Sequence, residues 1–241
     1  MSSIDVSLLI DDRNREIWDN LNEQLEIDVQ ESTDNEYHVY SEGKKSTIYV
    51  VADEMCIDSF MHKLLHVYIR YKEIFIAAGF SNTISASNTL NNIISPALKE
   101  HFGNCLDHIK MYQIYEKLGF TPKKFITDFD LHKCNPAELS SLKKYYKERG
   151  AYNVQAVDLY IGKFIAIFAD FNNDLDYEPA LNILYKLDPE LYTALDCFIE
   201  KWEEFDIENQ DPISNSYYVL LFELYDDLKK WMNGKRFISS K

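Results

Sequence analysis

Residues that break helices are scarce in this sequence, and this scarcity constrains its fold more than any other feature. Only 7 Gly and 6 Pro occur in 241 residues. Apolar residues recur at helical spacing over most of the chain rather than alternating with polar ones. The sequence therefore predicts a helix-rich protein. The expected helical segments are roughly 13–25, 57–77, 87–101, 104–118, 136–150, 152–169, 178–186, 188–206 and 214–233.

One segment departs from this helical pattern. Tyr37 and Val39, and then Ile48 and Val50, alternate with other residues on either side of a turn at 42–45. Such alternation around a Gly-containing turn is typical of a β-hairpin. This is the strongest hairpin signal in the sequence, and we expect it to form the only sheet and to pack beside the helix that follows it. The predicted fold class is α+β, mainly helical.

The charge balance excludes some classes of partner. The chain has 25 Lys+Arg against 40 Asp+Glu, a formal net charge of −15, with a pI of about 4.8. Binding a nucleic acid requires clustered positive charge, which this composition does not favour. No apolar run reaches the roughly 18 residues of a membrane span, and the N-terminus lacks the pattern of a signal peptide. We expect a cytoplasmic protein that binds neither nucleic acid nor membrane.

No linker, repeat or low-complexity tract divides the chain. We expect residues 1–150 to form the domain with the hairpin, and residues 151–241 to form a C-terminal helical lobe packed on it as one compact unit. The 4 Cys contain no CxxC pair, which favours reduced thiols over a disulfide framework or a zinc ribbon.

Two histidines at helical spacing carry the chemical signal. His62 and His66 are four residues apart in a segment with helical periodicity, so both lie on one face, about one turn apart. Two imidazoles in this arrangement can direct their nitrogens at a single tetrahedral cation. A predicted strand precedes the helix, which is the local context expected of zinc peptidases.

Segment 62–66, His-Lys-Leu-Leu-His, resembles the HExxH helix of the zincin-fold zinc metallopeptidases in its HELLH form, with Lys63 at the glutamate position. Residues 104–111 resemble the second helix, which supplies the third metal ligand in such proteins. The resemblance covers residues 37–120, about a third of the chain. It implies a zincin-like domain that binds zinc.

Two adjacent residues compete as the third metal ligand, Asp107 and His108. Neighbouring residues of a helix point about 100° apart, so at most one of them completes the site. We favour His108, because three imidazoles make a plausible set of neutral ligands. Asp107 then serves as a hydrogen-bond acceptor behind the ligands.

Lys63 is the departure that matters most for function. In an active zincin, the glutamate at this position is the general base that takes a proton from zinc-bound water. A lysine near its reference pKa of about 10.4 is an ammonium at neutral pH and cannot accept that proton. Its charge also weakens metal affinity, unless burial and the metal lower its pKa. The substitution therefore counts against peptidase activity.

Two functional hypotheses follow. The first is a catalytically impaired or inactive zincin-like pseudo-peptidase, an interaction protein that binds a peptide or protein partner in its former cleft. The second is a working zinc hydrolase in which Asp58 or Glu73 replaces the base, since both lie near the stripe of the two histidines. Asp58 is equally suited to cap the helix, and Glu73 to be exposed. Because Lys63 places a cation where the base should be, the sequence favours the first.

Overall fold

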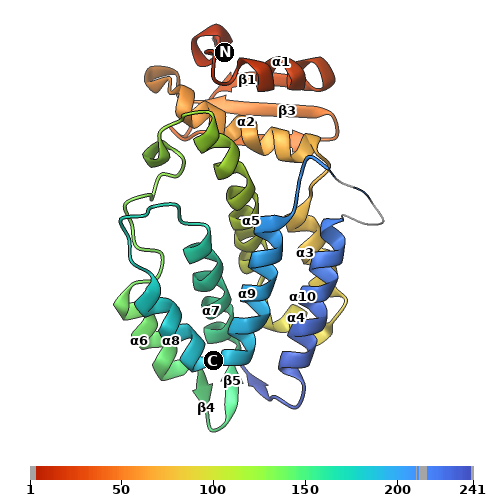
Figure 1. Cartoon of the computed structure of the whole chain (residues 1–241), viewed down its shortest axis with the longest axis vertical. Coiled ribbons are helices and arrows are strands. Elements are labelled where there is room, and N and C mark those ends of the chain that lie inside the picture. The colour runs from red at the N-terminus through yellow and green to blue at the C-terminus, as the bar shows by residue number, and fades with distance from the viewer. Residues whose placement is uncertain (1–3, 210, 212–215, 240–241) are drawn as a thin grey trace. The chain divides into compact units, whose positions relative to one another are not determined.

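The computed structural model describes residues 4–209, 211 and 216–239. This part of the chain contains ten α-helices and two small three-stranded sheets (Figure 1), which confirms the prediction of an α+β, mainly helical fold. The chain divides into two compact units, Met1–Ile74 with Lys110–Phe129 and Phe75–Ile109 with Asp130–Lys241. The expected boundary after residue 150 stays a prediction.

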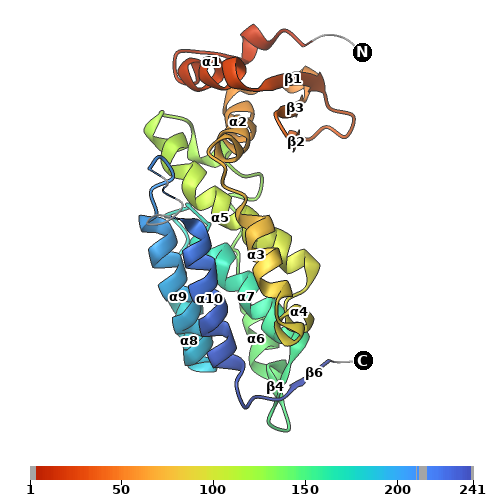
Figure 2. The ribbon, with the colours of Figure 1, turned by 90° about the vertical axis from the view of Figure 1, so that its right-hand side faces the viewer.

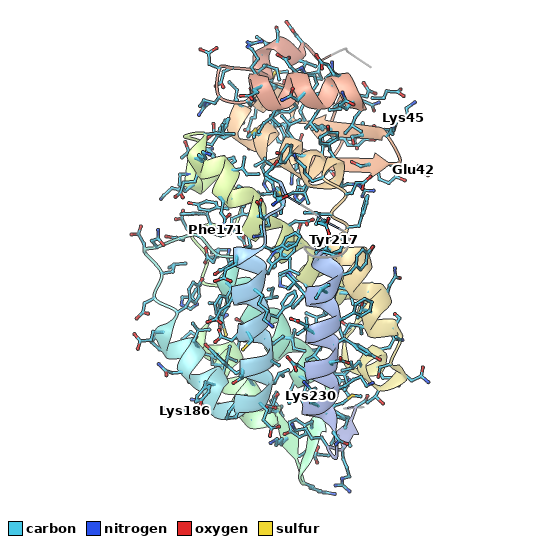
Figure 3. All side chains as sticks on the ribbon, turned by 45° about the vertical axis from the view of Figure 1, so that its right-hand side comes forward. Glu42, Lys45, Phe171, Lys186, Tyr217 and Lys230 are labelled. Carbon is cyan, nitrogen blue, oxygen red and sulfur yellow. The ribbon has the colours of Figure 1, made fainter. Side chains whose placement is uncertain are left out.

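The first unit contains a mixed sheet in the order β1-β3-β2. Its strands are β1 (Glu26–Glu31), β2 (His38–Glu42) and β3 (Lys45–Val50). Strands β2 and β3 form the predicted antiparallel hairpin, with Gly43 in the turn at φ +58°. Glu42 and Lys45 pair beside that turn (Figure 3). Strand β1, which runs parallel to β3, was not predicted.

Helix α2 (Ile57–Tyr71) packs against β2 and β3, and α1 (Arg15–Gln24) contacts both α2 and β1. Burial alternates along β3, where Ile48 and Val50 are fully buried. This period of two turns one face of the strand toward the core. Helix α2 has buried residues on most of its circumference, so its side chains are held tightly by their neighbours.

Helix α2 ends earlier than the sequence predicts. The expected helix runs to residue 77, but α2 stops at Tyr71 and α3 (Ile76–Ser85) begins separately. Glu73 adopts the left-handed region at φ +58°. The Ile74 N–H then donates to the Ile69 carbonyl at 3.2 Å. A left-handed residue that closes a helix in this way redirects the chain.

Helix α5 (Pro96–Lys117) is continuous where the sequence predicts a break between residues 101 and 104. Gly103 lies inside it, and a Cβ at this position would stand 2.3 Å from the Cβ of Ala77. The glycine therefore permits close packing of α3 on α5. Pro96 starts α5. The expected helix 87–101 is therefore divided between α4 (Asn88–Ile93) and the first part of α5. Short 3₁₀ helices lie at Val6–Leu9, Ala52–Glu54 and Pro122–Lys124.

The second unit is mainly helical, and its α10 packs against α9 and α3 (Figure 2). Its remaining helices are α6 (Pro136–Tyr145), α7 (Val154–Phe168), α8 (Glu178–Leu187), α9 (Pro189–Glu204) and α10 (Tyr217–Met232). Asn135 and Glu138 form a capping box at the start of α6, as their spacing suggests. Positions 214 and 215 of the last expected segment lie outside the described residues.

A second small sheet replaces the end of one expected helix. Helix α6 stops at Tyr145 instead of Gly150, and a hairpin follows with Gly150 in its turn at φ +78°. This sheet has the order β4-β5-β6. Its strands are β4 (Lys147–Glu148), β5 (Ala151–Asn153) and β6 (Phe237–Ile238). The expectation that the first hairpin is the only sheet is therefore wrong.

One buried carboxylate ties the second unit together. Asp188, only 4% exposed, caps α9 by accepting from the Leu191 N–H at 3.1 Å. It also accepts from the Tyr146 hydroxyl at 2.9 Å and from Trp231 Nε1 at 3.0 Å. Burial and this carboxylate raise the pKa of Tyr146, which keeps the phenol protonated as a donor. Within the described residues, no helix is both long and apolar enough to cross a membrane.

Candidate metal centre

Helix α2 directs two histidines at one point. The Nε2 atoms of His62 and His66 lie 3.2 Å apart, and their ring centroids are separated by 5.1 Å with planes 28° apart. His62 is buried and His66 is half-buried. This is the arrangement expected of residues four apart on a helix, so the predicted common face of the two imidazoles is confirmed.

Aromatic side chains of the first unit hold the His62 ring in place. Phe125 stacks on it, with centroids 4.6 Å apart and planes 16° apart. Tyr112 meets Phe125 edge to face at 5.3 Å. Burial raises the pKa of Tyr112 to about 12, and the Glu116 carboxylate adds to this shift. An apolar wall of this kind limits the rotamers open to an imidazole and favours one fixed position.

His108 joins the pair. It lies on α5, the continuous helix that also carries Tyr112. Nitrogens of His62, His66 and His108 all lie within 4.8 Å of one another. His108 is buried, with 8% of its surface exposed. Asp107 is half-buried and is not a member of this group.

The spacing of these nitrogens suits a tetrahedral metal ion. Two nitrogen ligands at 2.0–2.1 Å from zinc are about 3.3 Å apart at the tetrahedral angle. The observed separation of 3.2 Å between the Nε2 atoms of His62 and His66 matches this value. The third nitrogen, at up to 4.8 Å, must move closer by up to about 1.5 Å on binding. A buried group of three imidazoles could therefore hold a metal ion.

The protons of the pair constrain its chemistry. With both rings neutral, a hydrogen bond between the two Nε2 atoms requires one ring to donate and the other to accept. His62 and His66 then carry different tautomers. A metal ion needs a lone pair from each ring, so binding shifts the proton of one ring to Nδ1 or releases it.

Lys63 occupies the position that holds a glutamate in the resembling family. It is half-buried on α2, directly after His62. Burial lowers the pKa of the Lys63 ammonium, and the negative charge of Glu36 opposes part of this shift. A carboxylate attracts a metal cation, whereas an ammonium in the same place repels it. A charged Lys63 therefore disfavours a metal ion here, and the lowering of its pKa by burial reduces this effect.

Of the two carboxylates considered as replacement bases, Asp58 lies on α2 four residues before His62, whereas Glu73 lies beyond the end of the helix. Asp58 Oδ1 accepts from the Thr121 N–H at 2.8 Å, and its Oδ2 lies 3.8 Å from the Arg13 guanidinium. Glu73 is exposed in the left-handed turn that follows α2. It therefore does not continue the helical stripe of the two histidines.

Phe125 and Tyr112 were not predicted as surroundings of the histidines, because neither belongs to the expected motif. Comparisons with protein-family models, with curated proteins and with solved structures find no match. The case for a metal centre therefore rests on the geometry of His62, His66 and His108.

Proposed function

We propose that this protein is a zincin-like pseudo-peptidase: His62, His66 and His108 bind zinc, and the domain binds a peptide or protein partner without cleaving it. The observation that carries the proposal is the 3.2 Å separation of two Nε2 atoms on one helix face. His108 supplies the third nitrogen within 4.8 Å. Zinc held by three histidines supplies a Lewis acid with one open coordination position.

The surroundings of Lys63 and Asp58 support binding over catalysis. A general base must reach the proton it removes and must be able to accept it. Lys63 stands at the position of the base but is a cation in its ordinary state. Asp58 is held by Thr121 and Arg13. The alternative of a hydrolase that uses Asp58 or Glu73 therefore has less support from the geometry.

An extended peptide is the ligand class that the first unit suits. Strand β2 pairs only with β3 within the sheet, so it is an edge strand. It also lies against α2, the helix that carries His62 and His66. An edge strand offers unpaired backbone groups to an added strand, and many peptide-binding domains use this mode.

A peptide-hydrolysis assay with zinc present tests the proposal. We expect no cleavage of a broad peptide library by the wild type above background. Lys63→Glu restores a carboxylate, and general-base assistance is worth about 10²–10⁴-fold in rate. A gain in that variant would show that zinc and helix geometry are intact, whereas no gain would indicate a site adapted to binding alone.

Matched variants make the assay decisive. Arg70→Glu makes the same change of charge at an exposed position of α2, and we expect it to leave hydrolysis at background. Strong wild-type cleavage that is lost in His62→Ala would overturn the pseudo-peptidase proposal in favour of the hydrolase. Cleavage that persists in His62→Ala would come from a contaminant or from another site.

A further inference from the structure

The second unit begins with a long stretch that carries no ionisable acid or base. Residues 75–98 contain no Asp, Glu, Lys, Arg or His, although charged residues make up 27% of the chain. At that frequency these 24 positions would hold about six charges. The exposed positions of α3, α4 and the turn between them are instead Ala78, Asn82, Ser85, Ala86, Asn88, Thr89, Asn91 and Asn92.

Helix α10 adds exposed aromatic side chains beside this stretch. Tyr218 and Phe222 are 45% and 57% exposed, and Tyr225 follows on the same side of the helix. Together with α3 they border a groove of about 280 Å³. The residues that line this groove, which we name the neutral groove, are Gly79, Asn82, Thr83, Ala86, Tyr218, Phe222 and Tyr225.

Small residues of α3 form one wall of the neutral groove. A Cβ on Gly79 would stand 2.9 Å from Leu221 Cδ1, so the glycine allows α10 to approach α3 closely. The charges of α10 lie beside the aromatic row or at its end, where Asp226 and Lys229 are both exposed. Glu223 pairs with Lys201 of α9 at 2.7 Å, and Lys229 Nζ lies 5.2 Å from the Tyr225 ring centroid at the end of the aromatic row.

We propose that the neutral groove and the exposed aromatic row beside it form a homodimer interface. Two chains that each carry a charge of −15 repel one another over most of their surfaces. Contact through a face with few charges reduces this repulsion and removes Tyr218 and Phe222 from water. A basic partner, by contrast, gains little from a face that α3 and α4 leave without acidic residues. The face therefore fits a second copy of this chain better than an oppositely charged protein.

The face is also self-complementary. A twofold interface brings the same patch of both copies together, so it needs a projection and a matching recess within one patch. Phe222 projects from α10, and Ala86 leaves the adjacent wall of the groove low. The two helix faces offer on the order of 500 Å² per copy, given helices of 16 and 10 residues. That area is below the roughly 800 Å² of a standard interface, so the dimer is weak and depends on concentration.

Sedimentation equilibrium of the full chain tests this proposal. We expect monomer at low micromolar concentration and a growing dimer fraction toward the millimolar range. Raising NaCl from about 0.05 M to about 0.5 M should strengthen the dimer, because salt screens the repulsion between two acidic chains. Monomer at every concentration and salt level, or a dimer that salt weakens, would overturn the proposal.

Charge placed on each wall tests the location of the interface. Phe222→Asp and Asn82→Asp put a carboxylate on opposite walls of the neutral groove, and each should weaken dimerisation by about tenfold or more. Leu131→Asp is the matched control, because Leu131 is apolar and 65% exposed but lies outside α3 and α10. Circular dichroism should show that all three variants remain folded. A dimer that survives both groove variants, or that Leu131→Asp weakens equally, would contradict this interface.

Discussion

Asp188 in the second unit and the pair of His62 and His66 in the first unit differ in the atoms that contact them. This difference distinguishes a structural role from a functional one. In the second unit, the Asp188 carboxylate accepts from the Tyr146 hydroxyl, Trp231 Nε1 and the Leu191 N–H. These three donors come from separate elements and all bond to the one carboxylate, which therefore has a structural role. In the first unit, His62 and His66 turn the same ring atom toward each other. Two nitrogen atoms of the same kind that point at one place suit a bound cation. The atoms around a polar group therefore indicate its role better than its burial does.

Removing the Asp188 carboxylate should have the largest effect on stability. Asp188→Ala leaves three buried donors without their acceptor, so we expect the free energy of unfolding to fall by about 3–5 kcal/mol. Urea denaturation measures this change. Asp226→Ala is the control, because Asp226 is exposed on α10, and it should change stability by less than about 0.5 kcal/mol. A loss below about 1 kcal/mol for Asp188→Ala would refute its structural role.

Local patterns in the sequence predicted much of the fold. Helical periodicity located most helices, the alternation at residues 37–51 located the β2–β3 hairpin, and the spacing of His62 and His66 placed both on one face. These features depend on neighbouring residues alone. The Ile27 and Val29 alternation in β1 was a usable signal, but charged residues separate and flank it.

Other features depend on tertiary contacts that no local pattern encodes. Glu73 ends α2 in a left-handed conformation that is uncommon for a glutamate. Gly103 reads as a possible break but serves the packing of Ala77 against α5. The stacking of Phe125 on His62 likewise joins residues far apart in the sequence. The surroundings of the candidate site therefore could not be read from the motif.

Zinc should stabilise the wild type by an intermediate amount. A ligand that binds only the folded state at about 100 times its Kd adds about 2.7 kcal/mol to the free energy of unfolding. We expect this gain in urea denaturation of the wild type and its loss in His66→Ala. Asp188→Ala should keep the gain while starting from lower stability, because Asp188 is not one of the proposed ligands. Equal zinc stabilisation of His66→Ala and the wild type would show that His66 is not a metal ligand. The proposed difference between Asp188 and the two histidines would then be lost.

Asp58 should behave as a supporting carboxylate with a smaller effect. Asp58→Ala removes the acceptor of the Thr121 N–H at 2.8 Å, and we expect a loss of about 1–2 kcal/mol in unfolding free energy. Asp53→Ala is the control, because Asp53 is exposed just before α2. Zinc affinity should stay within about twofold of the wild type. A large loss of zinc binding in Asp58→Ala would instead move this carboxylate into the metal centre.

The smallest effect concerns Asp11 at the surface of the first unit. The hydrogen bond from Arg13 holds the pKa of Asp11 below its usual range. A lowered folded pKa adds stability above the unfolded value of about 3.9, and this stability is lost as the pH falls through the folded value. For an exposed pair the gain is on the order of 0.5 kcal/mol. Asp11→Asn should therefore lose this much at neutral pH and nothing in strong acid, as measured by urea denaturation at both pH values.

The zinc content of the purified protein tests the central claim most directly. After incubation with zinc and dialysis, we expect roughly one zinc per chain in the wild type, in Asp107→Asn and in the control His132→Ala. The double variant His62→Ala plus His66→Ala should hold far less, and so should His108→Ala. X-ray absorption of the bound zinc should give nitrogen distances of about 2.0–2.1 Å. Zinc content far below one per chain in the wild type, or unchanged by the double variant, would contradict the metal centre.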